Sequence, residues 1–188
     1  MEKSKHVYDK KEEKYLFECL EKTITKCSTY IASITKELEE KEKRHNEKRI
    51  KAGRNPHKSK WQGTTARINL IGGFIFTLFS VEKVMKYNVT LFLPLKKFIQ
   101  ARNEDFFLKA DIYPGVTPDE IHFFTNIWTV PGALEEKEKE TIWRFWDNQI
   151  AIVEDWLELT KWKPSEEDEL MNWGIDYEAE AKKVGIKL

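Results

Sequence analysis

The amino-acid sequence predicts an all-α protein: a helical bundle of four to six helices with a long, partly protruding N-terminal helix and a basic arm or loop. Two observations lead to this prediction. Apolar residues recur with helical spacing in the first third of the chain, and several helix-start signals punctuate the rest. At 188 residues the chain suits one compact domain with an appendage. We expect residues 1–63 to form the N-terminal helix with its basic arm, and residues 64–188 to form a compact, aromatic-rich bundle.

The first helix is expected from about Val7 to Arg49. Its apolar residues recur at alternating steps of three and four, which is a heptad seam. The seam comprises Phe17, Leu20, Ile24, Cys27, Ile31, Ile34 and Leu38. Such a stripe either docks the helix on its own domain or forms a self-association interface, and the sequence leaves both open. Beyond Leu38 the seam stops, so residues 39–49 are expected to be a solvated helix or arm, followed by a loop containing Gly53 and Asn55-Pro56.

A second helix is expected from Thr64, a suitable N-cap, to about Tyr87. Its middle, Ile68 to Val81, is apolar on all sides, which is typical of a helix at the centre of a bundle. Gly72-Gly73 would then allow a neighbouring helix to approach closely. A buried strand is the competing interpretation, because short apolar runs are ambiguous.

The segment from Val89 to Leu93 is expected to be a short strand or an extended link, because Pro94 disfavours helix in the residue before it. Pro94 then begins a helical segment that reaches about Ala110. The sequence Thr117-Pro118-Asp119-Glu120 is a helix start with a capping box. The short aromatic helix that follows is expected to end before Pro131-Gly132.

A long helix is expected from about Ala133 to Lys161. Its buried side is marked by Ile142, Phe145, Ile152, Trp156 and Leu159, widened by Trp146 and Val153. Ser165 is expected to cap a last short helix that ends at Gly174, and Asp176 is a possible start of another.

Charge is segregated along a chain whose formal net charge is zero. From Lys41 to Arg67 ten basic residues stand against two acidic ones, whereas from Gly132 to Leu188 fifteen acidic residues stand against eight basic ones. A basic block of this kind favours contact with nucleic-acid phosphates. The candidate nucleic-acid-binding residues are Lys41, Lys43, Arg44, Lys48, Arg49, Lys51, Arg54, Lys58, Lys60, Trp61 and Arg67.

Four of these residues, Lys41, Arg44, Lys48 and Lys51, share one helix face because they are separated by steps of three, four and three. His45 and His57 can add hydrogen bonds, and Trp61 or Arg54 can stack on an exposed base. Duplex DNA is the expected partner. Two alternatives remain: the block pairs with the acidic C-terminal third, or it is simply a solvated helix end.

The six tryptophans between Trp128 and Trp173 are mostly expected in the core, with an interface role kept for Trp162 and Trp173. The candidate interface therefore combines these two with the seam residues Phe17, Leu20, Ile24, Ile31, Ile34 and Leu38.

The sequence carries no pattern for a metal, a cofactor or catalysis, so none is expected. Glu42-Lys43-Arg44-His45 holds a single Glu-x-x-His, whereas a di-iron bundle needs two such motifs and two further glutamates. Gly72-Gly73 matches neither phosphate-binding glycine pattern, and a Gly-x-Ser-x-Gly is absent.

The cellular context is expected to be the cytoplasm, or a virion if the source is a virus. The charged N-terminus is unlike a signal peptide, and the fourteen uncharged residues from Ile68 to Val81 are too few to span a bilayer. Cys19 and Cys27, eight residues apart on one helix, lie about 12 Å apart, too far for a disulfide. The Asn88-Val89-Thr90 glycosylation sequon is then a chance match. Many Lys and Glu with only three Gln favour a thermophilic source, although an AT-rich genome also enriches Lys.

These observations together favour a non-enzymatic helical protein that binds nucleic acid and assembles with its own copies. Opposite charge at the two ends of the chain suits head-to-tail contacts. A basic helical arm attached to an apolar bundle resembles the architecture of coat proteins of filamentous archaeal viruses, which implies a structural role. The alternative is a protein-binding adaptor whose basic block pairs with an acidic surface. An enzyme whose site the sequence does not reveal is the third possibility.

Overall fold

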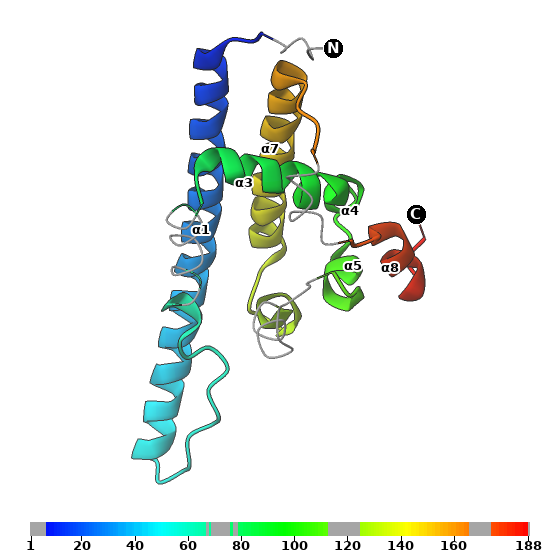
Figure 1. Cartoon of the computed structure of the whole chain (residues 1–188). Coiled ribbons are helices and arrows are strands. Elements are labelled where there is room, and N and C mark those ends of the chain that lie inside the picture. Colours follow the sequence, from blue (N-terminus) through cyan, green and yellow to red (C-terminus); the bar gives the residue numbers. More distant parts are fainter. Residues whose placement is uncertain are drawn as a thin grey trace.

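The computed structural model describes residues 7–66, 68, 76, 79–112, 125–165 and 174–187. Helices account for all the regular secondary structure in these residues, and none of the described segments forms a strand, so the predicted all-α class is confirmed. A long N-terminal helix, α1 (Lys10–Lys51), lies alongside a second long helix, α7 (Glu136–Thr160) (Figure 1). Shorter helices cross this pair, and one end of α1 projects beyond the other elements (Figure 1).

Helix α1 begins and ends where local chemistry favours it. The Asp9 carboxylate accepts a hydrogen bond from the amide of Lys11 at 2.8 Å, and two glutamates occupy the first turn. Three basic residues occupy the last turn, where positive charge is favourable beside the free carbonyls. With 42 residues, the helix is about 63 Å long at 1.5 Å per residue.

The apolar seam of α1 packs against α7 of the same chain. Leu20 is completely buried with Val153 and Trp156 in one core cluster, and Cys27 and Ile34 are buried with Ile142 in another. The seam therefore serves the intrachain core, one of the two alternatives that the sequence left open. Its use for self-association stays a prediction.

Burial also explains the chemistry of the seam cysteine. It raises the pKa of the Cys27 thiol to about 12, against a smaller opposing effect of a hydrogen bond with Trp146. The thiol thus stays protonated and acts as a small apolar filler. Both cysteines are free, as their spacing predicts.

Two predictions for residues 64–95 are wrong. The expected continuous helix from Thr64 to Tyr87 is interrupted at Ser80, whose hydroxyl accepts from the amide of Lys83 and caps a new helix, α3 (Val81–Tyr87). The expected strand or link is helical, because α3 continues into a π-helix (Asn88–Phe92) and a 3₁₀ turn (Leu93–Leu95). Pro94 is accommodated there in the first turn of the 3₁₀ segment, which leads into α4 (Lys96–Gln100).

The sequon falls in the π-helix. Asn88 is buried, and its side chain donates to the carbonyl of Val84 and accepts from Gln149 of α7. A side chain held in this way is a packing residue and not a glycan acceptor.

The predicted helix from Pro94 to Ala110 is also broken, since Asn103 caps a separate helix, α5 (Glu104–Lys109). The expected long helix is α7, although it starts at Glu136, where Glu135 and Glu138 form a capping box. The predicted start at Asp176 is confirmed, because its carboxylate caps α8 (Tyr177–Lys183). Gly72-Gly73, the helix start at Thr117, and the helix expected between Ser165 and Gly174 lie outside the described residues.

Of the tryptophans expected in the core, Trp143 and Trp156 are buried, and Trp128 and Trp146 are half-buried against the core clusters. Trp128, Trp143 and Trp146 form an aromatic cluster with Phe107 of α5. Trp162 is half-buried against Trp156, and Trp173 lies outside the described residues. Among the helices of the described chain, none is both long and apolar enough to cross a membrane.

Candidate nucleic-acid interface

The projecting end of α1 is not a free helix, because the chain folds back along it. After Lys51 the segment 52–65 reverses direction and lies beside the last turns of α1 (Figure 1). We refer to residues 39–65 as the basic arm. It holds nine basic residues and four acidic ones.

Polar side chains of α1 tie the returning segment to the helix. Near the tip, the Arg49 Nε donates to the carbonyl of Asn55 at 2.8 Å. One turn earlier, Asn46 makes two hydrogen bonds with the backbone of His57: its Nδ2 donates to the carbonyl at 3.0 Å, and its Oδ1 accepts from the amide at 2.9 Å. The imidazole rings of His45 and His57 stack beside this pair, with centroids 5.5 Å apart and planes 9° from parallel.

Glu42 is the central anchor of the arm. Its carboxylate accepts from the amide of Lys60 at 2.6 Å, from the amide of Trp61 at 3.3 Å and from the hydroxyl of Ser59. Partial burial pushes the pKa of Glu42 upward, but these hydrogen bonds and the nearby charge of Lys60 together outweigh it, so the pKa lies below its ordinary value. The Glu42 carboxylate therefore stays charged at neutral pH while it is turned inward.

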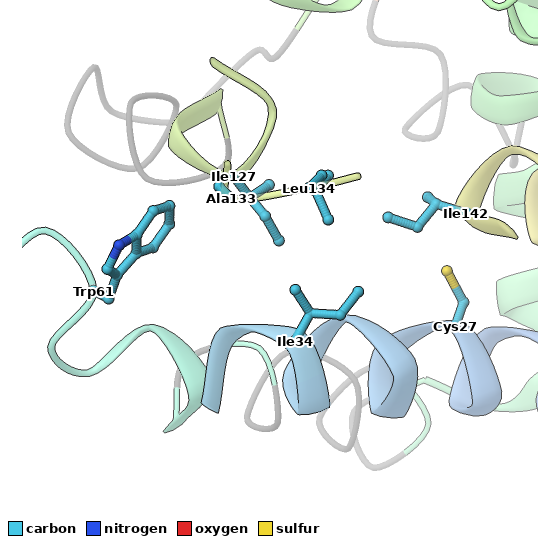
Figure 2. Packing of buried hydrophobic residues seen from close by; sticks show 7 residues of the cluster. All are labelled: Cys27, Ile34, Trp61, Ile127, Ala133, Leu134 and Ile142. Carbon is cyan, nitrogen blue, oxygen red and sulfur yellow. The ribbon is translucent and has the colours of Figure 1, made fainter. Parts of the chain in front are cut away.

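The base of the arm joins the hydrophobic core. Glu39 accepts from the amide of Thr65 at 3.0 Å. The indole of Trp61 is 6% exposed and lies in a cluster with Ile34 and Ile127 (Figure 2). Trp61 thus anchors the returning segment by burial.

The heptad of α1 supplied a signal that sequence analysis missed. Steps of four, three and four lead from Leu38 to Glu42, His45 and Arg49, so the seam positions continue with polar residues. Each of the three contacts the returning segment. The expected solvated helix is present, since α1 continues to Lys51 and most side chains of residues 39–51 are exposed. What the sequence did not suggest is a polar seam that holds the returning segment where the apolar seam ends.

Most cations of the arm are exposed to solvent. Eight of the nine are exposed, and the part of the chain described by the structure contains no ion pair for any of them. They are Lys41, Lys43, Arg44, Lys48, Lys51, Arg54, Lys58 and Lys60. Some basic residues elsewhere are paired: Arg102, for example, contacts Glu140 and Asp147 at 3.1 and 2.7 Å. In the acidic C-terminal third, a hydrogen bond from Lys137 and, to a smaller extent, the charge of Lys41 in the arm lower the pKa of Glu135.

The remaining candidate residues occupy different positions. Arg49 is half-buried and ties the tip of the arm, so it has a structural contact that the sequence did not suggest. The ring of Trp61 is buried, so the prediction that it stacks on a nucleic-acid base is wrong. Arg67 lies outside the described residues.

Within the described ranges, no group of three or more His, Cys, Asp or Glu side chains is arranged to hold a metal ion. The carboxylate of the Glu42-x-x-His45 motif is instead occupied by hydrogen bonds from the returning segment. Comparisons with protein-family models, curated proteins and solved structures find no match.

Proposed function

We propose that the protein is a non-enzymatic nucleic-acid-binding protein that uses the basic arm to contact phosphates, with duplex DNA as its ligand. One observation carries the proposal. The arm projects from the helical body with eight exposed cations and no ion pair among the described residues, while Glu39 and Glu42 are turned inward to backbone amides.

The shape of the arm supports phosphate contact along a line. Lys41, Arg44, Lys48 and Lys51 lie on one uninterrupted helix and share a face. Residues 39–51 span about 20 Å at 1.5 Å per residue. A duplex presents one negative charge per roughly 1.7 Å of its axis, so this length of helix lies opposite several phosphates. Lysines and arginines that form no ion pair with the described residues can replace the counterions of those phosphates.

A charge-reversal experiment tests this assignment. The triple variant Arg44→Glu, Lys48→Glu, Lys51→Glu should lose affinity for a fluorescent 30-base-pair duplex by more than about 100-fold at 50 mM salt. The matched control is Lys14→Glu, Lys22→Glu, Lys26→Glu, which reverses three exposed lysines elsewhere on α1. The control changes the net charge equally and should lose much less affinity.

Salt dependence supplies a second readout. Affinity of the unaltered protein should fall steeply between 50 and 200 mM salt, because each phosphate contact releases a counterion. Absence of binding at 50 mM salt, or equal losses in the two triple variants, would contradict the proposal. Binding of the arm to an acidic protein surface would then be the better explanation.

A further inference from the structure

We propose that the stacked pair His45–His57 is a proton-linked phosphate contact, so that the protein takes up protons when it binds nucleic acid and binds more tightly as the pH falls. This inference rests on the proposed function and assigns a regulatory property to the same surface. It requires two exposed imidazole rings that are held close together and surrounded by cations. The basic arm meets these requirements with His45 and His57.

The two rings come from opposite sides of the arm. His45 lies on α1 at a seam position, and His57 lies on the returning segment, 5.5 Å away between ring centroids. Both side chains are exposed. The Asn46 side chain makes two hydrogen bonds with the backbone of His57, so the two rings are positioned by these hydrogen bonds as well as by stacking.

The charged surroundings of the pair are mostly positive. On α1, the side chains one turn away from His45 are Lys41 and Glu42 on one side and Lys48 and Arg49 on the other. On the returning segment, Lys58 is the neighbour of His57. Glu42 is the one carboxylate in this group, and its oxygens already accept three hydrogen bonds from residues 59–61.

Proton uptake follows from this arrangement. Histidine is the side chain whose ordinary charge change falls between pH 5 and 8. A bound phosphate places negative charge beside the pair and can accept an N–H hydrogen bond from each imidazolium. Nucleic acid therefore binds the doubly protonated pair better than the neutral one.

The rest of the arm keeps its structure over the pH range of interest. The pKa of Glu42 is lowered, so its carboxylate remains charged and hydrogen-bonded between pH 5.5 and 8. A change in affinity over this range is therefore not caused by release of the returning segment.

The test measures affinity for the same duplex at 50 mM salt and at pH 8.0, 7.0, 6.0 and 5.5. Affinity of the unaltered protein should rise by about tenfold from pH 8.0 to 5.5, as expected for linked protonation. The double variant His45→Gln, His57→Gln keeps polar side chains but cannot take up these protons. Its affinity should match that of the unaltered protein at pH 8.0 within about threefold and change by less than about twofold at pH 5.5.

The chain offers a matched control, because it has four histidines. The double variant His6→Gln, His122→Gln should retain the full pH dependence, with circular dichroism confirming its helicity. An equal pH dependence in the His45/His57 variant and the unaltered protein overturns this inference alone. A large loss of affinity in that variant at pH 8.0 also overturns it, since the pair would then only support the arm. Absence of binding at every pH overturns the proposed function as well.

Discussion

The two parts of α1 are held to the molecule in different ways. From Leu16 to Leu38 the helix buries apolar side chains against α7. From Glu39 to Lys51 it makes hydrogen bonds with a segment that carries almost no apolar side chains until Trp61. The same heptad spacing serves both parts, with leucines and isoleucines in the first and Glu42, His45 and Arg49 in the second.

The two parts of α1 therefore have different roles: the first stabilises the fold, and the second presents the basic surface. Apolar burial is strong and insensitive to charge, so the first part can fix the fold. Hydrogen bonds between exposed groups contribute little net stability but leave the outer surface free for cations. A basic helix end is thereby given a defined shape without neutralising its charge.

A substitution in the apolar part of α1 is expected to change the stability of the protein most. Leu20→Ala should lower the free energy of unfolding by about 2–5 kcal/mol, because Leu20 is fully buried and its truncation leaves a cavity. Thermal denaturation followed by circular dichroism measures the loss. The exposed neighbour provides the control: Glu18→Ala should cost less than about 0.5 kcal/mol. Similar losses in the two variants would show that the α1–α7 contact is not the main source of stability.

A smaller, local effect is expected in the arm. Glu42→Gln removes the charge from three hydrogen bonds and should favour local opening of the returning segment by about 1–3 kcal/mol. Amide hydrogen exchange at Lys60 and Trp61 should accelerate, while exchange in the α1–α7 core stays unchanged. Glu47→Gln, at an exposed position of the same helix, serves as the control. If exchange accelerated equally in the core, the two parts of α1 would form one cooperative unit.

The smallest effect is expected on acidification. The pKa of Glu42 is lower in the folded protein than its ordinary value of 4.5, so its contribution to stability is present above pH 4.5 and is lost as the pH falls below that value through the folded pKa. Exchange at the Lys60 and Trp61 amides, corrected for its intrinsic pH dependence, should indicate opening of the arm as the pH falls below 4.5. The Glu42→Gln variant should lack this transition. A transition of the same size in the variant would assign it to other carboxylates.

Local signals predicted much of the fold correctly. The α1 heptad and the Asp176 cap depend on neighbouring residues along one helix, and both appear in the structure. The apolar side of α7 was predicted in part: Ile142, Val153 and Trp156 are buried, but Trp143 and Ile150 were missed. Breaks at Ser80 and Asn103 were missed, because both residues also occur inside helices and become caps only when the chain turns. The helix through Pro94 was missed because the packing of Phe92, Leu93 and Ile99 on α7 overrides a local preference for extended backbone.

The candidate interface shows the same division. Composition and spacing by themselves determined that the chain has a long helix ending in a cluster of cations, four of them on one face. Only the tertiary structure decided which polar residues turn inward, that Trp61 is buried, and that His45 meets His57. The physical reason is that helical periodicity determines which side chains are neighbours within one helix. The contacts of the returning segment instead depend on hydrogen bonds between residues up to 30 positions apart in the sequence, which periodicity does not predict.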